Sequence, residues 1–178
     1  MNKEGSFRPI AITLVISMLI ALFWDSLGFL RDLVHAIFDP SAGALLNLNI
    51  TWGMMLIVFA LTLITTLIQK YTTDQEALKD LKKEQKALQA EMKEHKDNPQ
   101  KIMELQKQSF AAIPKTMKLS MRSFAYTTIP LILFFRWFMD FFEVLGGYKF
   151  FGFLGWFMFY LIFTLIFSSI FRKVLKVV

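Results

Sequence analysis

The sequence predicts an all-α integral membrane protein in which membrane-spanning helices are combined with a charged helical hairpin. Of its 178 residues, 55% are hydrophobic and only 19% are charged. A soluble domain of this length could not bury so much apolar surface. The apolar residues also gather into runs of about 20, the length that a helix needs to cross about 30 Å of hydrocarbon. Between two of these runs lies a stretch rich in Lys and Glu that has helical periodicity.

Residues 1–48 are predicted to form an N-terminal hydrophobic helix followed by an external amphipathic helix. The apolar run at residues 10–24 would rise only about 22 Å as a helix, which is short of the hydrocarbon core. We therefore expect an external or partly inserted helix, peripheral to a core of three spans. Lys3 and Arg8 favour the alternative, a cytoplasmic start and a fourth span.

The amphipathic helix is predicted from apolar residues that recur at helical spacing before Pro40, while polar residues such as His35 and Asp39 fall on the opposite face. Such a helix would lie along the outer interface of the membrane. The alternative is that the segment continues the first helix. The apolar positions are Leu27, Leu30, Val34 and Ile37.

Three segments are predicted to cross the membrane and form the core of the fold. They occupy residues 49–69, 118–141 and 150–171. The third segment carries no charge. The second contains Arg136, for which Asp140 four residues later is a candidate ion-pair partner.

Residues 70–117 are predicted to fold as an antiparallel coiled-coil hairpin. Apolar or weakly polar residues recur every three or four positions on both sides of Asp97-Asn98-Pro99, a sequence with strong turn chemistry. Pro114 is expected to kink or end the returning arm just before the second span. The two seams comprise Leu78, Leu81, Gln85, Leu88, Met92 and His95, then Ile102, Leu105, Ser109 and Ala112.

The charge distribution predicts the orientation of the chain. Residues 69–122 contain twelve Lys or Arg against eight Asp or Glu, and the tail at residues 172–178 adds Arg172, Lys173 and Lys176. The positive-inside rule therefore places the hairpin and the C-terminus in the cytoplasm, and the link at residues 142–149 outside. We expect a multi-pass protein of the plasma membrane.

No pattern of residues indicates catalysis or metal binding, so we expect neither an enzyme nor a cofactor. The chain has no Cys, and its two histidines, His35 and His95, are predicted on opposite sides of the membrane. Glycine-rich phosphate loops, nucleophile elbows and HExxH motifs do not occur.

Polar side chains gather at one depth of the three predicted spans, next to the hairpin. Their spacing of three and four residues puts them on one face of each helix. We expect these faces to form a shared hydrophilic concavity, which would let a polar segment of another chain enter the membrane without losing all its hydration. The alternative is that each hydroxyl bonds to its own helix or joins helices together. The residues are Thr62, Thr65, Thr66 and Gln69, then Ser120, Ser123 and Thr127, with Arg122 on a neighbouring face of the same helix, then Thr164 and Ser168.

This layout resembles the archaeal branch of the YidC/Oxa/Alb membrane protein insertase superfamily. It is also similar to tail-anchored-protein insertase subunits and to the insertase-like subunit of the ER membrane complex. The resemblance covers residues 49–178, with one span, a charged hairpin and a closing pair of spans. It implies an insertase-like three-helix core that receives nascent or newly made membrane proteins in a groove and passes them into lipid. Bacterial members carry a groove arginine in the first core span; this chain does not, and Arg122 is the nearest substitute.

The partners implied are nascent membrane-protein chains, a translating ribosome, the lipid bilayer and accessory membrane subunits. Hairpin lysines would contact ribosomal RNA phosphates or the emerging chain, or else only keep the hairpin soluble. These are Lys79, Lys82, Lys83, Lys86, Lys93 and Lys96. Two other function classes stay open: a membrane-anchored coiled-coil adaptor or scaffold, and a small channel or transporter. The latter would need charges or broken helices near the midplane.

Overall fold

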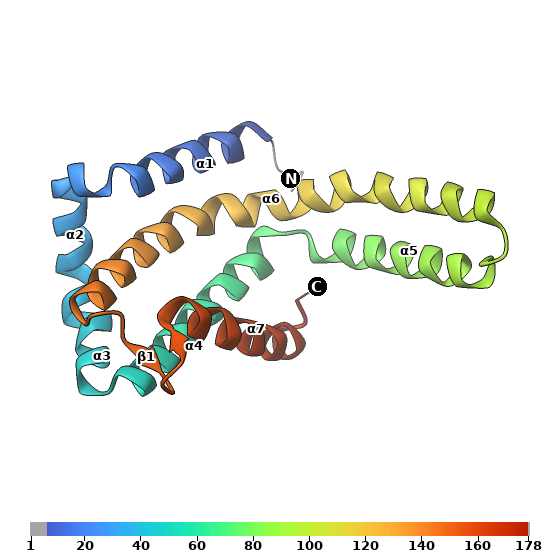
Figure 1. Cartoon of the computed structure of the whole chain (residues 1–178). Coiled ribbons are helices and arrows are strands. Elements are labelled where there is room, and N and C mark those ends of the chain that lie inside the picture. The colour runs from blue at the N-terminus through green and yellow to red at the C-terminus, as the bar shows by residue number, and fades with distance from the viewer. Residues whose placement is uncertain (1–6, 178) are drawn as a thin grey trace.

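The structure, a computed structural model, describes the backbone of residues 7–177 and, within it, the side chains of residues 11–121 and 123–177 (Figure 1). The chain is almost entirely helical. Its N-terminal part comprises α1 (Phe7–Leu22), η1 (Trp24–Ser26), α2 (Gly28–Phe38), the π-helical turn η2 (Asp39–Gly43) and α3 (Ala44–Leu48). The rest comprises α4 (Ile50–Thr72), α5 (Gln75–Glu94), α6 (Pro99–Val144), the antiparallel strands β1 (Lys149–Phe150) and β2 (Leu154–Gly155), and α7 (Trp156–Leu175).

Helices α4, α5 and α6 each begin at a side-chain cap. The carboxamide of Asn49 accepts a hydrogen bond from the backbone N–H of Trp52 at 3.0 Å. Asp74 and Asn98 accept in the same way at the starts of α5 and α6, each at 3.1 Å. Such caps satisfy amide groups that have no partner inside the helix. The local sequence therefore sets where α4 begins, where the hairpin begins and where it turns.

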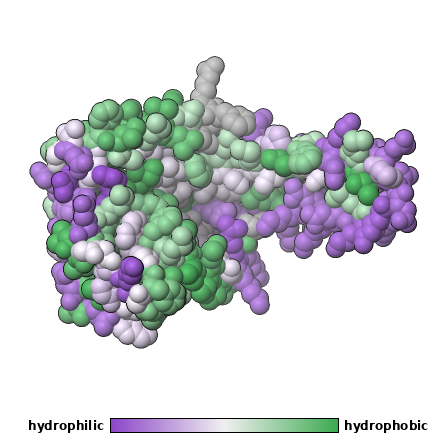
Figure 2. Space-filling model, viewed as in Figure 1, coloured by the Kyte–Doolittle hydropathy of each residue, from purple (hydrophilic) through white to green (hydrophobic). Residues whose placement is uncertain are grey.

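Helix α5 packs back along the first part of α6, so residues 75–117 form a helical hairpin that projects from the rest of the molecule (Figure 1). Leu78 and Ala112 are buried at its base, and Leu105 is buried further along. Around these contacts the hairpin surface is mostly hydrophilic, whereas the rest of the molecule is predominantly hydrophobic in this view (Figure 2).

Helix α6 runs unbroken for 46 residues, from the hairpin turn through the whole of the second predicted span. Pro114 and Pro130 both lie inside it. The sequence predicted that Pro114 would kink or end the returning arm, but the helix does not end there. A proline removes one helical hydrogen bond, and the packing of α6 against α5 and α1 offsets that loss. The hairpin arm and the predicted span are one continuous helix.

The main hydrophobic core lies at the end of α4, α6 and α7 that is opposite to the hairpin, which we call the far end. Met54 and Val58 of α4 meet Trp137 and Phe138 of α6 and Phe159 of α7 there, and all five side chains are fully buried. Helices α4 and α7 are long and apolar enough to cross a membrane. The second half of α6 lies with them in this core.

The third predicted span begins later than expected. The sequence placed it at residues 150–171, but α7 starts at Trp156 and extends to Leu175. Residues 149–155 instead form the β1–β2 hairpin, in which Gly152 adopts a φ of 84°. A left-handed turn of this kind favours glycine. Residues 150–155 carry no charge, and this property alone did not show whether they form an apolar turn or the first turns of the helix.

Helix α1 packs lengthwise against α6 and runs in the same direction (Figure 1). Leu14 lines the same cavity as Met117 and Ser120 of α6, near the hairpin. At the far end, the indole N–H of Trp24 donates to the carboxylate of Asp140 at 2.9 Å. Helix α1 therefore starts at the hairpin end of the bundle and packs along α6. Whether it is a peripheral helix with an external start or a fourth span with a cytoplasmic start stays a prediction.

The amphipathic helix α2 is separate from α1, as the pattern predicted, but its orientation differs. Leu30 and Val34 pack inward, whereas Ile37 is about half exposed. His35, predicted on the polar face, instead turns toward α6 and lies 3.1 Å from Asp140. The contact of His35 with the Asp140 carboxylate of α6 therefore determines the orientation of α2 more than the burial of its apolar side chains does.

Asp140 is the centre of a polar cluster that joins η1, α2 and α6 at the far end. Besides Trp24 and His35, its carboxylate accepts a hydrogen bond from Arg31 Nε at 3.1 Å. The predicted partner Arg136 instead places its guanidinium over the Trp24 ring, 5.6 Å from the centroid. The expected Arg136–Asp140 pair is therefore wrong.

A candidate client groove

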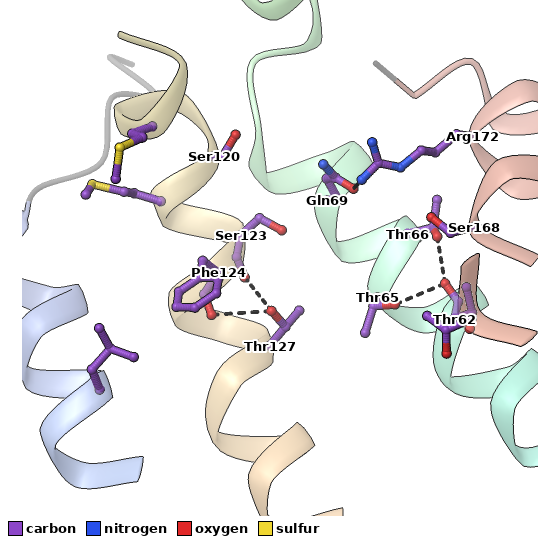
Figure 3. A pocket seen from close by; sticks show the side chains of 14 residues that line it. Thr62, Thr65, Thr66, Gln69, Ser120, Ser123, Phe124, Thr127, Ser168 and Arg172 are labelled. Carbon is purple, nitrogen blue, oxygen red and sulfur yellow. Dashed lines mark hydrogen bonds between the residues drawn. The ribbon is translucent and has the colours of Figure 1, made fainter. Parts of the chain in front are cut away.

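A cavity of about 560 Å³ lies between α4, α6 and α7 at the hairpin end of the bundle, with α1 at its edge (Figure 3). Nine of the residues that the sequence assigned to a concavity line it: Thr62, Thr65, Thr66, Gln69, Ser120, Ser123, Thr127, Thr164 and Ser168. The remaining lining residues are Leu14, Met117, Met121, Phe124 and Arg172.

The cavity exists because side-chain volume changes along the three helices. At the far end, bulky residues such as Trp137 and Phe138 fill the space between helices completely. At the hairpin end, the facing positions carry Ser and Thr, which are too small to meet across the same gap. The sequence therefore produces a bundle that is sealed at one end and hollow at the other.

The α4 wall carries three threonine hydroxyls, but each of them already donates its proton to a backbone carbonyl of α4. Thr62 donates to the carbonyl of Val58 at 2.6 Å, and Thr66 donates to the carbonyl of Thr62 at 2.6 Å. Thr65 bonds in the same way to Leu61 at 2.9 Å. Each hydroxyl thus bonds to a carbonyl of its own helix, which is what the alternative to a hydrophilic concavity predicted. Each oxygen keeps lone pairs, so the wall can still accept hydrogen bonds from water or from a peptide N–H.

The α6 wall faces α4 across the cavity (Figure 3). Thr127 donates to the carbonyl of Ser123 at 3.1 Å, which is again a bond within one helix. Among the side chains that the structure describes, no hydroxyl of Ser120, Ser123 or Thr127 bonds across to α4 or α7. The described hydroxyls of the α6 wall therefore do not join α6 to α4 or α7.

Arg172 of α7 lies at the hairpin end of the cavity, where its Nη2 donates to the carboxamide oxygen of Gln69 at 3.1 Å. This bond ties α7 to α4 at the mouth (Figure 3). Arg172 is the one charged residue in the lining that the structure describes. A positive charge is thus available to the cavity from the third helix.

The sequence model of EMC3/TMCO1-like integral membrane proteins matches residues 35–168, about three-quarters of the chain. The chain belongs to the EMC3/TMCO1-like family. This family is part of the Oxa1/YidC/Alb3 insertase superfamily and has a general role in membrane protein insertion. No curated protein and no solved structure gives a significant match. The EMC3/TMCO1-like region runs from α2 into α7 and contains every cavity-lining residue except Leu14 and Arg172.

The sequence did not predict all the residues that line the cavity of this EMC3/TMCO1-like chain. Met117, Met121 and Phe124 follow the same spacing of three and four residues as Ser120 and Thr127, so one helical face already contained them. Leu14 could not be found in this way because it comes from a distant segment. Arg122, predicted in the groove, belongs to α6, but its side chain lies outside the described residues.

The predicted ribosome-contacting lysines lie away from the cavity of this EMC3/TMCO1-like chain, on or just after α5. All six side chains are exposed, and Lys83 pairs with Asp80 at 3.3 Å. They share one arm of the projecting hairpin. In the part of the chain that the structure describes, no group of three His, Asp or Glu side chains could hold a metal ion.

Proposed function

We propose that the protein is an insertase that receives nascent or newly made membrane proteins in the cavity between α4, α6 and α7 and passes them into lipid. One observation carries the proposal: an apolar bundle that is sealed at its far end contains, at its hairpin end, a cavity of about 560 Å³ to whose lining nine Ser, Thr and Gln residues contribute. Membership of the insertase superfamily supports it.

The proposed mechanism depends on reducing the cost of moving a polar segment through hydrocarbon. A peptide group without a hydrogen-bond partner in an apolar medium costs several kcal/mol. The hydroxyl oxygens of Thr65, Ser120 and Thr127, which are partly exposed, would accept hydrogen bonds from such groups or from accompanying water. The adjoining apolar segment of the client would meanwhile move past the cavity rim into lipid.

The proposed topology places the hairpin and the C-terminus in the cytoplasm of a plasma-membrane protein. Helix α4, the second half of α6 and α7 form a three-helix transmembrane core, and α5 with the first part of α6 forms a coiled-coil hairpin. The excess of Lys and Arg at residues 69–122 and at the C-terminus supports this orientation. Helix α1, which runs alongside α6, is a fourth membrane helix that starts in the cytoplasm.

Single cysteines test whether the cavity is open to water, and the chain has no native Cys to remove. Cysteines at Thr65, Ser120 and Ser168 should react with a charged thiol reagent added from the cytoplasmic side, because these residues line the cavity. Cysteines at Leu56 and Leu133 should not react, because they lie in the apolar far half. Equal labelling at all five positions would show that no water-filled groove exists.

Hairpin lysines provide the second prediction, which concerns a translating ribosome as partner. Replacing all six with glutamine should weaken binding to ribosomes that carry a membrane-protein nascent chain and should flatten its salt dependence, because fewer phosphate contacts release fewer counterions. Cosedimentation at several salt concentrations measures both effects. Replacing Lys115 and Lys118, which lie near the membrane end of the hairpin, serves as the control. Unchanged binding of the six-lysine variant would exclude α5 as the receptor.

A further inference from the structure

The β1–β2 hairpin at the far end carries large apolar side chains that the rest of the chain leaves uncovered. Phe151 is 63% exposed and Phe153 is 73% exposed. Both lie at the tip of the turn that joins the strands. Val144, Leu145 and Tyr148, in the link just before β1, are exposed as well.

The base of this hairpin is fixed to the bundle. Phe150 is fully buried, with its ring centroid 4.2 Å from that of Phe159 in α7 and 5.8 Å from that of Phe142 in α6. The strands pair Lys149 with Gly155 and Phe150 with Leu154. The exposed tip is therefore held at a set position relative to the end of α6 and the start of α7.

Phe151 occupies a backbone conformation that suits glycine better. Its φ is 54°, in the left-handed region, where a bulky side chain is strained and glycine is not. The ring gains little burial in return, since it is mostly exposed and lies 6.1 Å from the ring of Phe159. Strained residues of this kind cluster at functional sites.

We propose that Phe151 and Phe153 insert into the membrane interface and anchor the far end of the bundle to the lipid leaflet on that side. This inference rests on the proposed function in one respect, that α6 and α7 cross the membrane. A bilayer that contains these two helices has its surface where α6 ends and α7 begins, which is the level of the hairpin.

The charge beside the tip fits a lipid surface better than water or a protein partner. Lys149 is the one cation between Arg136 and Arg172 in the sequence, and its exposed side chain belongs to β1, which leads into the turn that carries the two phenyl rings. A cation at the level of the phosphate groups, with apolar rings just below it, is the arrangement typical of interfacial anchors. Pure hydrocarbon rings also need no hydrogen-bond partner at that depth.

Spin labelling measures where the tip lies. A nitroxide on a single cysteine at Phe153 is compared, in vesicles of phosphatidylcholine and phosphatidylglycerol, with labels at Leu165 on the exposed face of α7 and at Lys86 on α5. The label at Phe153 should be reached by dissolved oxygen and protected from a water-soluble nickel chelate, as at Leu165. Access of the chelate, as at Lys86, would overturn the anchor. Protection from both reagents would show a protein cover and overturn it too.

The same measurement separates a failed anchor from a failed function. If Leu165 is reached by the chelate, α7 does not lie in lipid, and both the transmembrane core and the anchor are wrong. If Leu165 is lipid-exposed and Phe153 is not, only the anchor is wrong.

Phe151→Gly tests the anchor without damaging the fold, because glycine removes the ring and also relieves the strained φ. Its melting temperature in detergent should equal or exceed that of the parent chain, while the label at Phe153 should shift toward the water-exposed values seen at Lys86. Phe29→Ala, which removes an 85% exposed ring from α2, should leave the label where it was. An unchanged label position in Phe151→Gly would show that the Phe151 ring contributes nothing to anchoring.

Discussion

Replacing Ser123 and Ser168 together with leucine should reduce insertion of a client with a short polar external segment by about tenfold or more, because losing about 1.4 kcal/mol of stabilisation is already a factor of ten. The two residues contribute hydroxyl groups from α6 and α7 to the same cavity. Leucine removes both groups and fills the space with apolar bulk. Protease protection of the client in vesicles that contain the purified protein measures the change.

Ser169→Leu is the matched control for this experiment. Ser169 neighbours Ser168 on α7, is exposed, and bonds to the carbonyl of Leu165 at 2.8 Å, but it does not line the cavity. The Ser169→Leu variant should insert clients at close to the rate of the parent protein. Similar losses in both variants, or no loss in the double variant, would show that clients do not pass through the cavity.

Asp140→Ala should lower the free energy of unfolding by about 2–4 kcal/mol, because hydrogen bonds to a charged group contribute about 1.5–3 kcal/mol each and one buried donor is left without a partner. The loss comes mainly from the indole N–H of Trp24, whose side chain is fully buried. Arg31 is partly exposed, so water can replace its bond. Denaturation in detergent micelles measures the effect.

Asp80→Ala is the comparison for this prediction. Asp80 also pairs with a cation, Lys83, but both side chains are more than two-thirds exposed on the hairpin. Exposed pairs of this kind contribute about 0–1 kcal/mol. Equal losses for the two variants would mean that the far-end cluster does not hold η1 and α2 against α6.

The lining of the cavity could be predicted from the sequence because helical periodicity is a local property. A spacing of three and four residues puts Thr62, Thr65 and Thr66 on one face whatever surrounds the helix. Because the three polar faces occur at the same depth, adjacent helices bring them together. Whether clients bind there stays a prediction.

Contacts between distant segments could not be predicted in the same way. Asp140 was assigned to Arg136 because the two are four residues apart, yet its partners are Trp24, Arg31 and His35. These residues precede it by more than a hundred positions, and no periodicity relates them. Similarly, hydropathy marks residues 150–155 as apolar but does not show whether an apolar segment forms a helix or a turn.

The unbroken course of α6 makes it a lever. Its 46 residues form a rod about 69 Å long at 1.5 Å per residue. One end lies at the hairpin turn, the middle forms a wall of the cavity, and the other end is clamped in the aromatic core. We therefore expect a displacement of the hairpin turn to be transmitted along α6 to the cavity wall, with Pro114 and Pro130 as the positions where the helix bends most easily.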